Sequence, residues 1–330
     1  MQYPKLNRKT KYKKIYYKEA IVSILVCILS FFASLMYTNG DQARYIAVYE
    51  KMPEMDIRQA FQFYSQLLSS KEILHFAITW CSSVIGFNKF IVMSIANLLL
   101  AFTFLVFLSQ RKISLIVSSI IVLTNFYFYA LYFSAERLKF AFILFFCAGL
   151  AVQKSRRFLT LAGLAILSHI QIIALYISYA CVWGSNLLFQ KSNNKYNNKT
   201  IITIIALFII MLGGGYLLRD QLITKFSSYY GITGFSIYGI VKTSGFMFIS
   251  MVYSKKISQP FFAFLPIICV ALIFGDSRVN IMGYFIFLYF VLPVKSGWNL
   301  GVLISSCYFA FKSYVFILSV IKYGDGYIIK

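Results

Sequence analysis

The segment FIVMSIANLLLAFTFLVFL, residues 90–108, contains no charged side chain. An α-helix needs about 20 apolar residues to cross the hydrocarbon core of a membrane, and this segment is close to that length. Apolar runs of similar length lie at residues 20–37, 113–133, 201–218 and 301–321. One such run would fit a buried core helix, but their repetition along one chain is typical of an integral membrane protein.

The composition of the whole chain agrees with this interpretation. Of its 330 residues 60% are hydrophobic and 13% are charged, with a mean hydropathy of +0.74. Continuous apolar runs favour helices over the alternating strands of a membrane barrel, because backbone groups in lipid must bond to one another. The sequence predicts an all-α, polytopic transmembrane helix bundle of about 10–12 spans. Residues 20–321 would form this single domain, between a basic N-terminus (1–19) and a short tail (322–330).

The net charge of +22 is spread over short basic clusters between the apolar runs, unlike the single basic surface of a nucleic-acid-binding domain. The positive-inside rule places these clusters, and with them the N-terminus, in the cytoplasm. The first run is too long for a cleaved signal peptide and is interpreted as an uncleaved span. The clusters are residues 5–18, Arg111-Lys112, Lys154 with Arg156-Arg157, Lys191/Lys195/Lys199, Lys255-Lys256 and Lys295.

The remaining connections then lie on the outer face of the membrane. Of the ten acidic residues, Glu19 falls on the cytoplasmic side and the others on this outer face, which indicates either a functional site there or a solvated surface. Residues 73–87 are too short for an ordinary span and are predicted to form a re-entrant or interfacial helix. Residues 158–190 must return to the basic side, so we expect two short helices with a break near His169.

Two arginines stand at the outer boundary beside acidic residues. Arg137 follows Glu136 and precedes Lys139, and Arg278 follows Asp276. A guanidinium binds phosphate oxygens through two parallel hydrogen bonds, so the pair is a candidate pyrophosphate site. The alternative is that each arginine pairs with its acidic neighbour and anchors a helix end.

His169 and Asp41 are the candidate proton acceptors. His169 lies with Ser168 and Gln171 in an otherwise apolar stretch, where a structural hydrogen bond is the competing interpretation. Asp41 belongs to Asn39-Gly40-Asp41, which is either a simple turn or, with Arg44 and Tyr45, a sugar-binding lip. Few acidic residues are present, and the sequence demands no metal and no cofactor.

The order of these residues resembles a known family. Gly40-Asp41 with Tyr45 and Tyr49, Glu72 before an apolar segment, Arg137 with Ala141, His169 after a helix, and Arg278 with Tyr284 together resemble the EpsG branch of the Wzy-type polysaccharide polymerases. The similarity covers about residues 20–295 and rests on single residues and their order. The chain departs from the family at Gln171, where a small residue is usual.

The resemblance implies a membrane glycosyltransferase that joins oligosaccharide repeat units carried on undecaprenyl pyrophosphate, at the outer face of the bacterial cytoplasmic membrane. Arg137 and Arg278 would stabilise the departing pyrophosphate, and His169 or Asp41, with Glu136, would provide acid–base chemistry. Arg44, Tyr45 and Glu72 are candidate sugar-binding residues. The expected partners are the lipid-linked oligosaccharide, the bilayer, and the flippase and chain-length regulator of the same pathway, with no nucleic acid.

Two other functions remain open at this stage. A flippase or transporter of lipid-linked oligosaccharides would need charged residues along a path through the bilayer, and the spans carry few of them. A membrane acyltransferase that modifies the polysaccharide would also use a histidine. Its acyl donor usually arrives from the cytoplasmic side, whereas His169 is predicted on the outer side.

Overall fold

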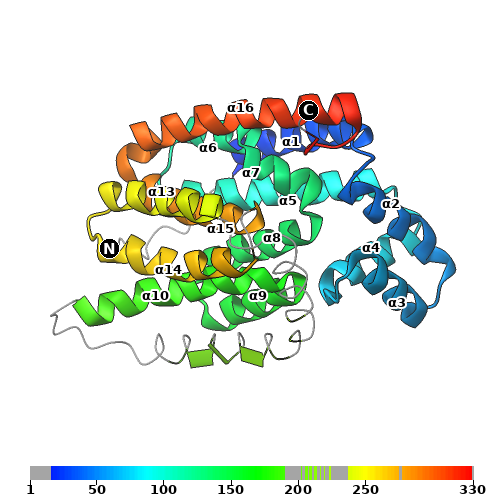
Figure 1. The fold of residues 1–330 in the computed structure, drawn as a ribbon, viewed down its shortest axis with the longest axis horizontal. Helices are drawn as coiled ribbons and strands as arrows, with labels where there is room; N and C mark the ends of the chain where they lie inside the picture. Colours follow the sequence, from blue (N-terminus) through cyan, green and yellow to red (C-terminus); the bar gives the residue numbers. More distant parts are fainter. Residues whose placement is uncertain are drawn as a thin grey trace.

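The computed structural model describes residues 16–189, 237–274 and 277–328, with isolated helical positions between 202 and 223. Helices dominate these residues and no β-strand occurs among them, which confirms the all-α class. The longer helices run side by side, and α2, α3 and α4 project from one end of the bundle (Figure 1). The helices of the bundle are α1 (Tyr17–Met36), α5 (Lys89–Gln110), α6 (Leu115–Thr124), α7 (Phe126–Tyr129), α8 (Glu136–Leu150), α9 (Ser155–Ser168), α10 (Ile173–Phe189), α13 (Ile237–Tyr253), α14 (Ser258–Phe274), α15 (Ser277–Val291) and α16 (Leu300–Tyr323).

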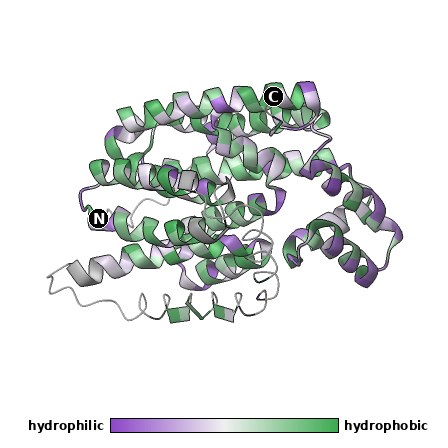
Figure 2. Cartoon of the chain, viewed as in Figure 1, coloured by the Kyte–Doolittle hydropathy of each residue, from purple (hydrophilic) through white to green (hydrophobic). Residues whose placement is uncertain are grey.

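Within the described part of the chain, three helical segments are long and apolar enough to cross a membrane. These segments are Tyr17–Met36, Lys89–Gln110 and Val294–Tyr323, and a bent pair of shorter helices would make a fourth. Shorter apolar helices accompany them, and hydrophobic residues predominate in the helices of the bundle (Figure 2). The structure therefore shows helices suited to a membrane, while the larger number of spans stays a prediction.

The composition of the apolar run at residues 113–133 suggested one straight helix, but the structure shows a bent pair. It divides into α6 and a second segment, Phe126–Ser134, with a bend of 55° between them. Asn125 causes the break, because its side-chain oxygen accepts a hydrogen bond from the backbone N–H of Tyr127 and so begins a new helix. The second segment ends in a π-helical turn, Ala130–Ser134, directly before α8.

The basic connections meet at one end of the bundle. The backbone N–H of Ser114 donates to the carbonyl of Ser296, which joins the loop after α5 to the loop before α16. The Arg111 guanidinium lies 4.0 Å from the ring centroid of Phe107 and 4.6 Å from that of Tyr289. Arg111-Lys112 and Lys295, which the positive-inside rule placed together, thus lie at the same end.

Three helices at the opposite end form a small lobe. They are α2 (Asp41–Lys51), α3 (Ile57–Leu68) and α4 (Ile73–Val84), which share a separate hydrophobic cluster. Asp56 caps α3 by accepting hydrogen bonds from the backbone N–H groups of Arg58 and Gln59. The cluster consists of Tyr45, Val48, Met52, Ala60, Tyr64, Leu68 and Phe76.

The segment that contains α4 begins and ends at the same end of the bundle. Glu72, just before α4, forms an ion pair with Arg137, and Lys89, just after it, forms one with Glu136. Because Glu136 and Arg137 are consecutive, the two ends of segment 73–88 lie close together at this end of the bundle. The re-entrant or interfacial position of the segment stays a prediction.

We expect a cysteine placed at the exposed Asn88, in a variant lacking the six native cysteines, to be labelled from outside intact cells by a membrane-impermeant thiol reagent. The physical reason is that α4 returns to the end opposite the basic loops, which the positive-inside rule holds in the cytoplasm. A cysteine at Asn193, a predicted cytoplasmic position outside the described residues, should react only after permeabilisation. The reverse pattern would invert the proposed orientation.

Candidate functional site

A buried carboxylate at the lobe end joins two residues that the sequence analysis singled out separately. Glu72 Oε2 accepts a hydrogen bond from Arg137 Nη1 at 2.7 Å, and Glu72 Oε1 lies 2.5 Å from His169 Nδ1. Ser70 Oγ also donates to Glu72 Oε2. The exposed fraction is 0% for Glu72, 1% for His169 and 7% for Arg137. These three residues form what we call the Glu72 cluster.

Three separate breaks in helical structure bring the Glu72 cluster together. Glu72 is the residue before α4, and Arg137 lies in the first turn of α8. His169 lies between α9 and the short 3₁₀ turn that precedes α10, as the sequence predicted. The positive ends of the α4 and α8 dipoles therefore lie near the carboxylate and favour its ionised form.

Both ring nitrogens of His169 have a polar contact. Nδ1–H donates to Glu72, and Nε2 lies 3.1 Å from the side-chain oxygen of Gln171. An imidazolium donates to both oxygens, whereas a neutral ring with its lone pair on Nε2 requires the Gln171 amide to turn over and present its NH₂. Glu72 fixes the tautomer and stabilises the positive ring, which is the role of the carboxylate in hydrolase triads.

A second charged group lies beside the first. Lys89 Nζ is 2.9 Å from Glu136 Oε1 and 2.6 Å from the side-chain oxygen of Gln42. Gln42 Nε2 in turn donates to Glu136 Oε1 at 2.8 Å and to the backbone carbonyl of Phe133. The buried Lys139 ammonium donates to the carbonyl of Tyr132 at 2.9 Å. The other Glu136 oxygen, Oε2, is buried and has no hydrogen-bond partner among the residues that the structure describes.

Tyr45 connects the two groups. Its hydroxyl accepts a hydrogen bond from Arg137 Nε at 3.1 Å, and Lys89 Nζ lies 5.8 Å from its ring centroid. One helix, α2, therefore contributes both Gln42, which contacts Glu136, and Tyr45, which contacts Arg137. The result is a continuous buried polar region at the junction of α2, α4, α5, α8 and α9.

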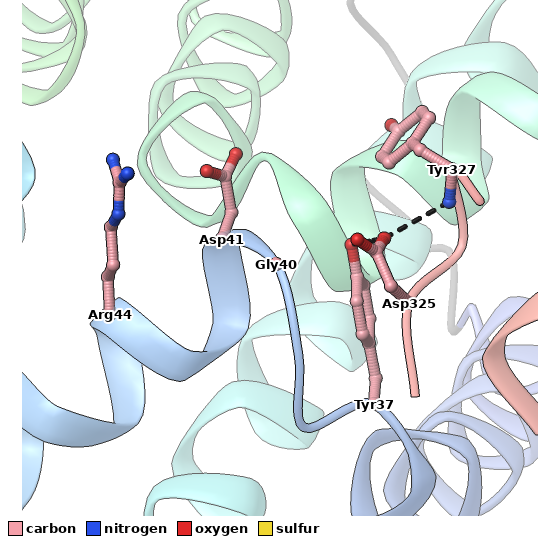
Figure 3. Close-up of a pocket in the computed structure, with 6 residues that line it drawn as sticks. All are labelled: Tyr37, Gly40, Asp41, Arg44, Asp325 and Tyr327. Carbon is pink, nitrogen blue, oxygen red and sulfur yellow. Dashed lines mark hydrogen bonds between the residues drawn. The ribbon is translucent and has the colours of Figure 1, made fainter. Parts of the chain in front are cut away.

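The predicted residues divide between this region and its surroundings. His169, Arg137, Glu72, Tyr45 and Glu136 meet in it, but Arg137 pairs with Glu72 and not with its neighbour Glu136. Asp41 and Arg44 line a separate pocket nearby (Figure 3). The side chain of Arg278 lies outside the described residues, so its predicted place beside Arg137 stays a prediction.

Lys89 and Gln42 were missed by the sequence analysis. Lys89 directly precedes the charge-free run of residues 90–110, where a lysine is interpreted as an ordinary interfacial residue at a helix start. Gln42 stands next to Asp41 and carries no charge to distinguish it. For Lys89, its position after a helix break and before a long apolar run was the available signal, but this signal does not specify a partner.

Replacement of Lys89 with methionine is expected to lower the thermal midpoint of the detergent-solubilised protein. The change leaves the Glu136 carboxylate buried without its counter-ion, a loss of about 3–5 kcal/mol in comparable buried pairs. Adding Glu136→Gln should restore much of the midpoint, because the buried charge is then removed. Lys51→Met, at an exposed position of α2, is the matched control. Strictly additive losses in the double variant would contradict the pairing.

Comparison with known proteins found no matching family model, no similar curated protein and no similar solved structure.

Proposed function

We propose that this protein is a membrane glycosyltransferase that polymerises oligosaccharide repeat units carried on undecaprenyl pyrophosphate. It would act at the outer face of the bacterial cytoplasmic membrane, with a cytoplasmic N-terminus and about 10–12 spans. The product would be a capsular polysaccharide, exopolysaccharide or O-antigen. The flippase and the chain-length regulator of the same pathway would be its partners.

The observation that carries this proposal is the Glu72 cluster, a histidine–carboxylate pair with a guanidinium attached. A glycosyl transfer of this kind needs a base for the attacking hydroxyl and a cation for the leaving pyrophosphate. His169, oriented by Glu72, supplies the first, and Arg137 supplies the second. The cluster lies at the bundle end opposite Arg111 and Lys295, where a lipid-linked substrate on the outer leaflet would place its pyrophosphate.

In the proposed reaction a hydroxyl of one lipid-linked repeat unit attacks the anomeric carbon of the growing chain on its lipid carrier. The Gln171 side chain moves away from His169 Nε2, which then takes the hydroxyl proton as the new C–O bond forms. The bond between the anomeric carbon and the pyrophosphate oxygen breaks, and undecaprenyl pyrophosphate leaves with that electron pair. Glu72 holds the ring and stabilises the imidazolium.

In this proposal Arg137 contacts the pyrophosphate while it holds Glu72. Its Nε and Nη1 atoms bond Tyr45 and Glu72, whereas Nη2 makes no hydrogen bond within the described residues. Its exposed fraction of 7% contrasts with the complete burial of Glu72. Nη2 is therefore the group that would meet a phosphoryl oxygen, with Arg278 as the proposed second cation.

The proposal is tested by deleting the gene in the producing bacterium and analysing its lipid-linked sugars. A polymerase defect gives single undecaprenyl-linked repeat units on the outer leaflet and no long polymer. Accumulation confined to the inner leaflet would instead identify a flippase. Polymer of normal length that lacks acyl groups would identify an acyltransferase.

A further inference from the structure

A pocket of about 340 Å³ opens between the loop after α1, the start of α2 and the C-terminal tail (Figure 3). This volume falls within the range of small-molecule sites, about 300–1,000 Å³. Neither Tyr45 nor Glu72, two of the candidate sugar-binding residues, lies in it. The lining residues are Tyr37, Gly40, Asp41, Arg44, Asp325 and Tyr327.

The C-terminal tail is fixed firmly as one wall of this pocket. The carbonyl of Gly324 accepts hydrogen bonds from the backbone N–H groups of Thr38 and Asn39, and Asn39 Nδ2 donates to the carbonyl of Tyr323. The Ser319 hydroxyl lies within hydrogen-bonding distance of the carbonyls of Asp325 and Ile328. These hydrogen bonds therefore hold the tail after α16 in a defined position against the loop after α1.

Gly40 lets the two walls approach each other. Its φ of +61° suits glycine, and a Cβ there would lie 2.5 Å from Asp325 Oδ2. A side chain at this position would push the tail away and open the pocket. The close packing explains why a glycine occupies the turn between α1 and α2.

The lining chemistry matches a neutral polyhydroxylated ligand. The lining contains two carboxylates, Asp41 and Asp325, and one guanidinium, Arg44, so its formal charge is negative and disfavours a pyrophosphate. The Tyr37 hydroxyl donates to Asp325 Oδ1 at 3.4 Å. Burial and then the Asp325 carboxylate raise the pKa of the Tyr37 phenol, which keeps it protonated as a donor. Tyr327, 51% exposed, offers a ring surface.

Helix α2 separates the pocket from the buried charged residues and contacts both. Asp41 and Arg44 lie on the pocket side of α2, whereas Gln42 and Tyr45 on the same helix contact Glu136 and Arg137. On the other wall, the Tyr327 hydroxyl is 2.8 Å from that of Ser134, two residues before Glu136. A ligand in the pocket would thus lie on one side of α2, with Glu136 and Arg137 on the other.

We propose that this pocket binds an uncharged sugar residue of the glycan substrate, and that the C-terminal residues Asp325 and Tyr327 help to select that sugar. The assignment rests on the proposed function for the identity of the glycan as substrate. The carboxylates accept hydrogen bonds from sugar hydroxyls, Arg44 donates to them, and the Tyr327 ring packs against a sugar face. The pyrophosphate of the same substrate is bound elsewhere, at Arg137.

The test measures glycan binding directly, on the purified full chain in detergent. The probe is a set of oligosaccharides released by mild acid from the surface polysaccharide of the producing cells, detected by saturation-transfer NMR. Asp325→Asn and Arg44→Gln, on opposite walls, are each expected to weaken binding about tenfold, as expected for loss of one hydrogen bond to a charged group. Lys322→Gln, at an exposed position in the last turn of α16, is the matched control and should bind like the wild type.

Each outcome decides the assignment. Binding by the wild-type chain, reduced in both wall variants and kept in Lys322→Gln, supports the pocket. Absence of binding to the wild-type chain, or equal binding by all four proteins, overturns it, even where the gene deletion shows a polymerase defect. If binding behaves as expected but the deletion leaves polymer intact, the pocket stands and the polymerase function fails.

Discussion

Glu72→Gln is expected to cause the largest loss of function of any single substitution in this protein. The Glu72 carboxylate contacts both His169 and Arg137. An amide has the same size but no charge, so it cannot stabilise a positive His169 ring or neutralise Arg137. Loss of general-base catalysis typically lowers turnover roughly 10²- to 10⁴-fold. Polymer yield should be measured by complementing the deletion strain, with turnover followed in membranes supplied with the lipid-linked repeat unit.

The same substitution should also lower stability, since it leaves the Arg137 cation buried without its partner. The cost of breaking such a pair is about 3–5 kcal/mol. Membrane abundance and the thermal midpoint in detergent must therefore accompany the activity. His169→Gln separates the two effects, because it removes the base and leaves the Glu72–Arg137 ion pair in place. Glu54→Gln, on the surface of the lobe, is the control. Wild-type polymer from both cluster variants would exclude Glu72 and His169 from the chemistry.

Arg137→Lys is expected to reduce polymer synthesis strongly even though it preserves the charge. A lysine presents one ammonium, so it cannot bond Tyr45 and Glu72 from two fixed directions while offering a third donor to a phosphoryl oxygen. For Arg137→Ala we expect roughly a hundred- to thousandfold drop in turnover, by analogy with removal of one preorganised donor from a charge-stabilising site. Arg278→Lys should behave similarly if it is the second cation.

An anchoring role for Arg137 predicts a different result. Lysine reaches the membrane interface as well as arginine does, so a mere helix anchor would tolerate the change. Arg58→Lys, an exposed residue at the start of α3, controls for the chemistry of the substitution itself. Normal polymer length and yield from Arg137→Lys at wild-type abundance would rule out the proposed pyrophosphate contact.

Several features of the fold were predictable because their causes are local. Continuous apolar runs specify helices suited to lipid, since no other element satisfies its backbone within one segment. The polar residues Ser168, His169 and Gln171 marked a real break between α9 and α10. The bend at Asn125 was missed, although an asparagine that caps the following helix is also a local signal. Because apolar residues flank Asn125 on both sides, residues 113–133 were interpreted as one continuous helix.

The sequence by itself also determined which residue types were available for chemistry, because few charged residues interrupt the apolar runs. It did not determine how they pair. Arg137 stands next to Glu136, yet the tertiary structure joins it to Glu72, 65 positions away, and joins His169 to the same carboxylate across 97 positions. Helix packing makes this choice: the first turn of α8 directs two consecutive side chains to different neighbours, Lys89 on one side and Glu72 on the other. The position of the tail that closes the pocket at Asp325 was likewise determined only by packing. So short a segment has no periodic pattern from which its contact with the loop after α1 could be predicted.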